Sequence, residues 1–125
     1  MKIVYLNGCN YSMEIDGIEF VDLSKEEQRE VCSRIIDSGK CSSSSLRKFY
    51  DYYMEGDKGE DLEEESFNNK DELEEQCKAI LYQTDCSECT MQTLIESFAE
   101  DKGNYKDLGY CETCGSYNEE YTIII

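Results

Sequence analysis

The sequence predicts an α+β fold, in which about four helices pack on a small antiparallel sheet built from both ends of the chain. Three observations predict it. The first 23 residues have strand patterns separated by turn dipeptides, the middle of the chain has helical apolar periodicity, and residues 121–125 are β-rich. Because sequence-distant strands need partners, we expect the last strand to pair with the N-terminal ones.

The N-terminal strands are predicted from two turn dipeptides. An apolar run at residues 3–6 precedes Asn7-Gly8, and alternating apolar residues at 11–15 precede Asp16-Gly17. Both dipeptides favour two-residue hairpin turns. With a further run at 18–21, they predict a meander of two or three strands.

Two helices are expected next. Ser24 and Glu27 form a capping-box pattern, and the apolar stripe that follows is ended by Gly39. A second helix is expected to start within residues 42–45 and to end at Gly56, because its apolar residues recur with helical spacing between these points.

The third and fourth helices follow an acidic stretch. Residues 69–72 can cap a third helix whose inner face is Leu73, Cys77, Ile80 and Leu81. A fourth helix is expected from Cys89 or Thr90 to about Gly103, followed by a loop at 104–110.

The length suits one domain, 1–125. We expect residues 1–84 to contribute the strand meander and three helices. Residues 85–125 should contribute a zinc-stapled helix, a cysteine knuckle and the final strand.

Four cysteines near the C-terminus form two matched pairs, and 21 residues separate Cys86 and Cys89 from Cys111 and Cys114. This spacing predicts a structural zinc ion held by four thiolates, with no open position for water. Reduced thiols, two disulfides and an iron–sulfur cluster are the alternatives. The cluster usually needs closer spacing, and a thioredoxin-like role needs a preceding strand in a βαβ unit.

The other four cysteines have no paired spacing. Cys32 and Cys77 lie on apolar helix faces and are expected to be small core residues. Cys9 and Cys41 lie in turn-like contexts, and a second metal site from these four is the alternative. The chain shows no signal peptide and no bilayer-length apolar stretch, so we expect a cytoplasmic protein in a reducing compartment.

Negative charge is the strongest compositional signal, with 29 Asp and Glu against 12 Lys and Arg and a net charge of −17. Acidity aids solubility, but useful magnitudes for a small domain are roughly 2–8. The excess predicts a surface that repels nucleic acid and binds basic proteins. The expected contact residues, with Tyr52 as an aromatic anchor, are Glu60, Asp61, Glu63, Glu64, Glu65, Asp71, Glu74 and Glu75.

An enzyme is not expected. The chain has no histidine, which removes the commonest acid–base catalyst and every Ser/His or Cys/His pair. It also has no glycine-rich phosphate loop.

The chain is small and strongly acidic, and it has the two cysteine pairs and the segment from Asp107 to Gly115. In these features it resembles phage-encoded anti-CRISPR proteins, the metal-containing kind directed against the type II, RNA-guided Cas nuclease. The resemblance implies a stoichiometric inhibitor in the host bacterial cytoplasm that blocks guide or target-DNA loading, because such nucleases hold their heteroduplex in a basic channel. The alternative is a zinc-ribbon-like adaptor that binds a host transcription or replication protein through its knuckle.

Overall fold

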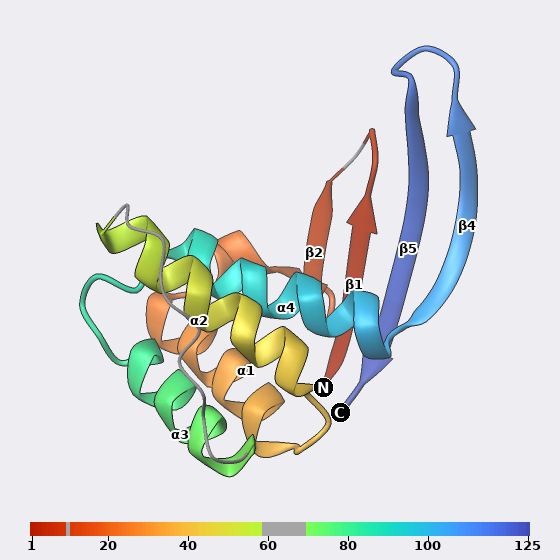
Figure 1. Ribbon diagram of the computed structural model, residues 1–125. Helices are drawn as coiled ribbons and strands as arrows, with labels where there is room; N and C mark the ends of the chain where they lie inside the picture. The colour runs from red at the N-terminus through yellow and green to blue at the C-terminus, as the bar shows by residue number, and fades with distance from the viewer. Residues whose placement is uncertain (10, 59–69) are drawn as a thin grey trace.

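The computed structural model describes residues 1–9, 11–58 and 70–125 (Figure 1). Its strands are β1 Lys2–Asn7, β2 Ser12–Ile15, β3 Ile18–Glu19, β4 Asn104–Cys111 and β5 Ser116–Ile124. Its helices are α1 Lys25–Asp37, α2 Ser43–Lys58, α3 Lys70–Leu81 and α4 Glu88–Lys102, with a 3₁₀ turn at Phe20–Asp22. The predicted α+β class and the pairing of both chain ends in one sheet are confirmed.

The sheet is antiparallel, and its strand order is β3-β2-β1-β5-β4. The strand that ends the chain therefore lies beside the strand that begins it, with Ile3 opposite Ile123 and Tyr5 opposite Tyr121. Backbone hydrogen bonds between Met1 and Ile125 join the two termini. The consequence is that β1 stands at the centre of the sheet and β4 forms one edge.

The core lies between the helices and one face of the sheet. Phe20, Phe49 and Phe98 are completely buried in it, together with Ile3 of β1. Helix α4 packs across β1 and β5 and also contacts α1 and α2. Figure 1 shows the helices gathered beside the lower part of the sheet, while β4 and β5 extend past them. We call this projecting β4–β5 hairpin the arm.

Local sequence signals account for several boundaries. Ser24 caps α1 by accepting a hydrogen bond from the Glu27 N–H, and the Glu27 carboxylate accepts one from Ser24, which confirms the capping box. The Asp16-Gly17 turn is also confirmed, with positive φ angles of 52° and 84°.

Other boundaries differ from the prediction. Asn7-Gly8 does not form a two-residue turn, because β2 begins only at Ser12. Gly56 does not end α2, which continues to Lys58. The run at 18–21 is a strand only at Ile18–Glu19, since Phe20 enters the 3₁₀ turn and the core.

The expected loop at 104–110 is the strand β4, and the final strand begins at Ser116 rather than at Tyr121. The exposure of β4 explains the error: six of its eight residues are exposed, so no alternation of apolar and polar residues marks it. A β-bulge between Asp107 and Gly109, where Gly109 has a φ of 88°, interrupts its pattern further.

Candidate functional site

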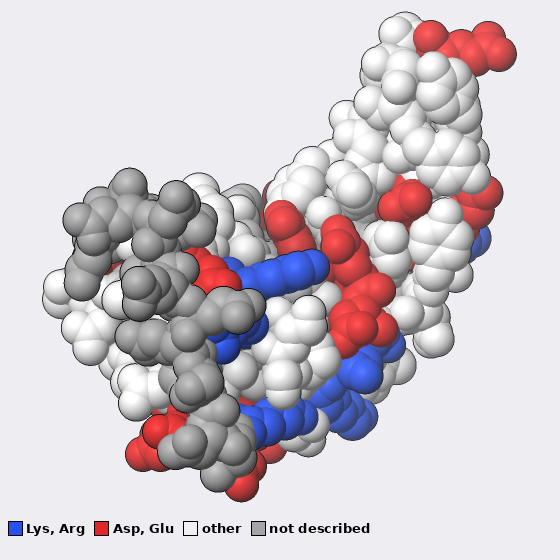
Figure 2. Space-filling view, viewed as in Figure 1, with Lys and Arg blue, Asp and Glu red and all other residues white. Residues whose placement is uncertain are grey.

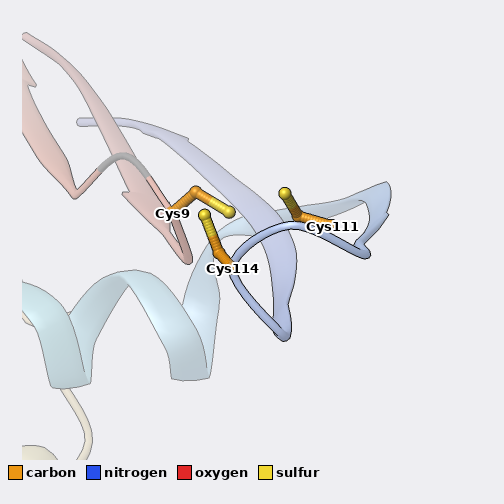
Figure 3. Close-up of side chains that lie close together, drawn as sticks. All are labelled: Cys9, Cys111 and Cys114. Atoms are coloured by element: carbon orange, nitrogen blue, oxygen red, sulfur yellow. The ribbon is translucent and has the colours of Figure 1, made fainter.

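Three cysteines come together where the arm meets the β1–β2 connection. The Sγ atoms of Cys9, Cys111 and Cys114 all lie within 4.8 Å of one another (Figure 3). Cys9 and Cys111 are half-buried, whereas Cys114 is exposed. Three thiols at this separation could hold a metal ion, because soft thiolate ligands bind zinc and copper(I). We call them the tip cysteines.

Cys9 reaches the arm because its backbone is tied to β5. Its N–H donates a hydrogen bond to the Asn118 Oδ1 over 2.9 Å. Gly8 makes this approach close: its φ is 140°, and a Cβ there would lie only 2.2 Å from the same Oδ1 atom. Any other residue at position 8 would therefore be strained at this φ and would displace Asn118, which holds Cys9 against the arm.

Cys111 and Cys114 are positioned by the hairpin turn of the arm. Cys111 ends β4 opposite Ser116, and the Gly115 N–H donates to the Cys111 carbonyl over 2.8 Å. Gly115 has a φ of 72°, which glycine adopts without strain. The turn thus brings both sulfurs to the same end of the hairpin.

Hydrogen bonds differentiate the thiols. The Cys114 N–H, followed by the Cys9 and Cys114 thiols, lowers the pKa of Cys111 to about 7. Hydrogen bonds with Cys9 and then Cys111 raise the pKa of Cys114 to about 12. A single thiolate supported by its neighbours is therefore favoured, and a bound cation would favour further ionisation.

Of the four ligands predicted from spacing, the structure brings together Cys111 and Cys114 and adds Cys9. Cys86 is completely buried just before α4, and Cys89 is exposed in the first turn of that helix. Neither belongs to the group of three. Spacing along the chain missed Cys9 because it lies about a hundred residues from Cys111; its one signal was a turn-like context after Asn7-Gly8.

The remaining cysteines are core residues. Cys32, Cys41 and Cys77 are completely buried, and burial raises the pKa of both Cys41 and Cys77 to about 12. The Cys77 thiol donates to the Leu46 carbonyl. Among the described residues, no group of potential metal ligands includes any of the three.

The tip also has a small hollow beside it. A cavity of about 320 Å³ lies between the β1 end and the arm, and Cys9 and Cys111 line it with Asn118 and Glu119. Three sulfurs leave a fourth tetrahedral position that a small molecule or a further side chain could occupy. The sequence argument that four sulfurs close the site against water therefore does not apply to this group.

The predicted contact residues fall in two parts of the chain. Asp71 and Glu75 are exposed on α3, Glu74 is half-buried there, and Tyr52 is exposed on α2. The other predicted contact residues, Glu60, Asp61, Glu63, Glu64 and Glu65, lie outside the described residues.

Comparison with protein-family models, with curated proteins and with solved structures found no match for this chain. No helix among the described residues is long and apolar enough to cross a membrane. Fold and site together define a small acidic α+β protein with a three-cysteine group that could hold a metal ion.

Proposed function

We propose that this chain is a non-catalytic, stoichiometric inhibitor that binds a nucleic-acid-handling enzyme through its acidic surface. One observation carries the proposal. With 29 Asp and Glu against 12 Lys and Arg and no histidine, carboxylates outnumber side-chain cations by 17. Such a surface attracts a basic groove built for nucleic acid and repels nucleic acid itself.

The distribution of the carboxylates supports this function. Acidic side chains are exposed on α3, at the end of α4 and along the arm, so the charge is not confined to one loop. Figure 2 shows red acidic side chains where the helical layer meets the arm and at the tip of the arm. Carboxylates on several elements allow the chain to contact a basic groove along its length rather than at one point.

The resemblance to anti-CRISPR proteins supplies the target class. Type II Cas nucleases hold the guide–target heteroduplex in a positively charged channel. An acidic protein seated there would compete with guide or target-DNA loading. Electrostatic association of this kind is fast and weakens as salt screens the charges.

Zinc is the metal proposed for the tip cysteines, and its role is structural. In a tetrahedral site with Zn–S bonds of about 2.3 Å, the sulfurs lie about 3.8 Å apart. The three Sγ atoms, all within 4.8 Å of one another, fit this geometry with small side-chain adjustments. The ion would join the β1–β2 connection to the turn of the arm.

The experiment is a cleavage assay with purified type II nuclease and a labelled DNA duplex, in which the chain is added before the guide RNA in one arm and after it in the other. We expect cleavage to stop at about one chain per nuclease and to recover as salt is raised. Cleavage unchanged at a large excess of the chain would reject this target class.

Two charge-reversal variants test which acidic surface binds the nuclease. The test variant reverses Glu63, Glu64, Asp71 and Glu75 to Lys, and the control reverses the exposed Glu19, Asp22, Glu26 and Glu30. Both variants change the net charge equally. We expect at least about tenfold weaker inhibition from the first alone, because specific charge pairs dominate over net charge at an interface.

The adaptor is a second candidate because the structure gives it a projecting element. Glu112 and Thr113 are exposed in the turn between Cys111 and Cys114. Replacing both with Ala should abolish capture of a transcription or replication protein, while the α3 reversals should leave it unchanged. Inhibition of a nuclease that is insensitive to these two replacements would instead favour the inhibitor.

A further inference from the structure

On one face of the sheet, the residues change from apolar to aromatic and acidic with distance from the helices. Cross-strand pairing places Ile3 and Ile123 in the core, and the next row is Tyr5, Tyr121 and Tyr105. The following rows are first acidic and then aromatic, with Asp107 opposite Glu119 and Tyr110 opposite Tyr117. Rows are separated by two residues along the strand, or about 7 Å.

We call the part of this face beyond the core the tyrosine face; its members are Tyr11, Tyr105, Asp107, Tyr110, Tyr117, Glu119 and Tyr121. At its inner end, rings contact one another and the buried Tyr5: the centroids of Tyr5 and Tyr121 are 5.9 Å apart and stacked, and those of Tyr105 and Tyr121 are 5.5 Å apart. Tyr11 joins the group edge-on to Tyr5 at 5.7 Å. Ring contacts therefore cross β1, β5 and β4 at the inner end of the tyrosine face, and Tyr110 and Tyr117 lie beyond the acidic row.

The helices do not cover the outer part of the tyrosine face. Tyr105, Tyr110 and Tyr117 are 53%, 61% and 47% exposed. Figures 1 and 2 show the arm rising away from the helical layer, with acidic side chains along the angle between them. Exposed aromatic residues on one face are typical of interfaces, where tyrosine is enriched among the residues that contribute most to binding.

Tyrosine hydroxyls hold the carboxylates on this face. Tyr121 and Tyr105 donate to Glu119 over 3.0 and 3.4 Å, and Tyr117 donates to Asp107. Among the described residues, no Lys or Arg lies within ion-pair distance of either carboxylate. The carboxylates are thus fixed in place while their charge stays available to a cation.

Helix α4 adds charge beside the tyrosine face. Glu96 accepts a hydrogen bond from the Tyr11 hydroxyl. Burial raises the pKa of Glu100, and the nearby Glu96 and Glu119 carboxylates raise it further, opposed by Lys48. Glu96, Glu100 and Glu119 are therefore close enough to act on one another, and a cation brought between them would relieve their mutual repulsion.

We propose that the tyrosine face is a docking site for an extended segment of a partner protein that is rich in Arg or Lys. An apolar segment would remove Asp107 and Glu119 from water without a partner, which costs free energy. A cationic segment pairs with the carboxylates while its side chains stack on the tyrosine rings, and Arg suits both contacts best. The identity of this partner as a nucleic-acid-handling enzyme rests on the proposed function.

The test uses the full-length chain and a fluorescent peptide of alternating Arg and Ser, with an alternating Gln and Ser peptide as control. Binding is followed by anisotropy. The double substitution Glu119→Gln and Asp107→Asn keeps the hydrogen-bonding shape and removes both charges. We expect Arg-peptide affinity to fall by at least about tenfold, because the charge pairs are lost.

Glu120→Gln with Glu14→Gln is the matched charge control, because it also removes two charges, both on the other face of the sheet. Glu120 is the neighbour of Glu119 on β5, pairs with Leu6 and Lys106, and faces the other side of the sheet. We expect less than about a twofold change from this control, since an off-site charge acts only through screened, long-range attraction. Equal losses in both variants would overturn the proposal by showing a response to net charge alone.

The aromatic contribution is tested separately. Tyr110→Thr with Tyr117→Thr removes two exposed rings and keeps residues suited to a strand. Tyr82→Thr is the control, because Tyr82 is 64% exposed but lies after α3, away from the arm. Weaker peptide binding in the first variant alone supports the proposal, and unchanged binding in it overturns the role of the rings.

Three further outcomes distinguish this surface from the proposed function. Nuclease inhibition that is equally strong in the Glu119/Asp107 variant would overturn the docking site and leave the inhibitor intact. Peptide binding that depends on this face, without nuclease inhibition, would support the docking site and reject the target. A chain dimer in sedimentation that Tyr110→Thr and Tyr117→Thr dissociate would overturn the cationic occupant in favour of a second copy.

Discussion

The helical layer and the arm use the same residue types in opposite ways. In the helical layer, Cys32, Cys77 and Cys86 are completely buried, and burial raises the pKa of each thiol. On the arm, Cys111 lies near the surface, and hydrogen bonds from its neighbours lower its pKa to about 7. Burial and hydrogen bonding therefore separate apolar core thiols from potential metal ligands.

Tyrosine shows the same division. Tyr5 is buried against the helices, whereas Tyr110 on the arm is 61% exposed and belongs to a face with no helix over it. The helical layer supplies stability through apolar burial. The arm has little buried surface of its own, so it depends on the sheet, on β1 and on the tip cysteines for its position.

The largest expected effect comes from the helical layer. Phe98 is completely buried on α4, and Phe98→Ala should lower the free energy of unfolding by about 3–5 kcal/mol. Urea denaturation followed by circular dichroism measures it. Tyr110→Ala on the arm is the matched control and should change the value by less than about 1 kcal/mol. Equal losses of unfolding free energy in the two variants would show that the arm contributes to stability as much as the helical layer does.

Metal removal should act on the arm. If the tip cysteines bind zinc, a chelator should lower stability by about 2.7 kcal/mol relative to zinc at a hundred times its dissociation constant. Hydrogen exchange should speed up in β4 and β5 and stay slow in α4. Uniform acceleration throughout the helices would show that the ion also stabilises the helical layer.

The capping box gives a smaller effect. Ser24→Ala removes the hydrogen bond to the Glu27 N–H and should cost about 1 kcal/mol, measured by thermal or urea unfolding. Ser116→Ala, at the half-buried start of β5, is the comparison on the arm and should cost less than about 0.5 kcal/mol. A larger loss of stability from Ser116→Ala than from Ser24→Ala would contradict this prediction.

The smallest effect is pH-dependent and lies between the regions. The pKa of Glu100 is raised in the folded chain, so its carboxylate form weakens folding once pH rises through that pKa. Glu100→Gln should therefore stabilise the chain at pH 7 by no more than about 0.5 kcal/mol, with no gain at about pH 3. The original chain and the variant are both unfolded in the presence of the same chelator, so that metal release does not contribute to the difference between their free energies of unfolding. A stabilisation by Glu100→Gln that increases towards low pH would contradict this prediction.

The sequence was informative where a short segment decides the structure. The Ser24–Glu27 capping box and the Asp16-Gly17 turn depend on residues only a few positions apart, and both are present. The inner face of α3 was also predicted, because Leu73, Cys77, Ile80 and Leu81 recur with helical spacing and are all buried.

The sequence was misleading where distant segments decide the structure. Strand β4 is stabilised by pairing with β5 rather than by its own burial, so its residues carry no alternating pattern. Cys9 approaches Cys111 only because β1 pairs with β5, which no local spacing reveals. Cys86 and Cys89 match a ligand motif, but the start of α4 turns one into the core and the other to the surface.

The zinc proposed for this chain is held by the tip cysteines and not by the two spaced pairs. Zinc content per chain after purification without chelator, measured by atomic emission for Cys9→Ala and for Cys86→Ala with Cys89→Ala, tests this assignment most directly. We expect Cys9→Ala to lose most of its zinc and the double variant to keep it. Zinc retained in Cys9→Ala but lost from a folded double variant would instead show that the four-cysteine site expected from spacing holds the ion.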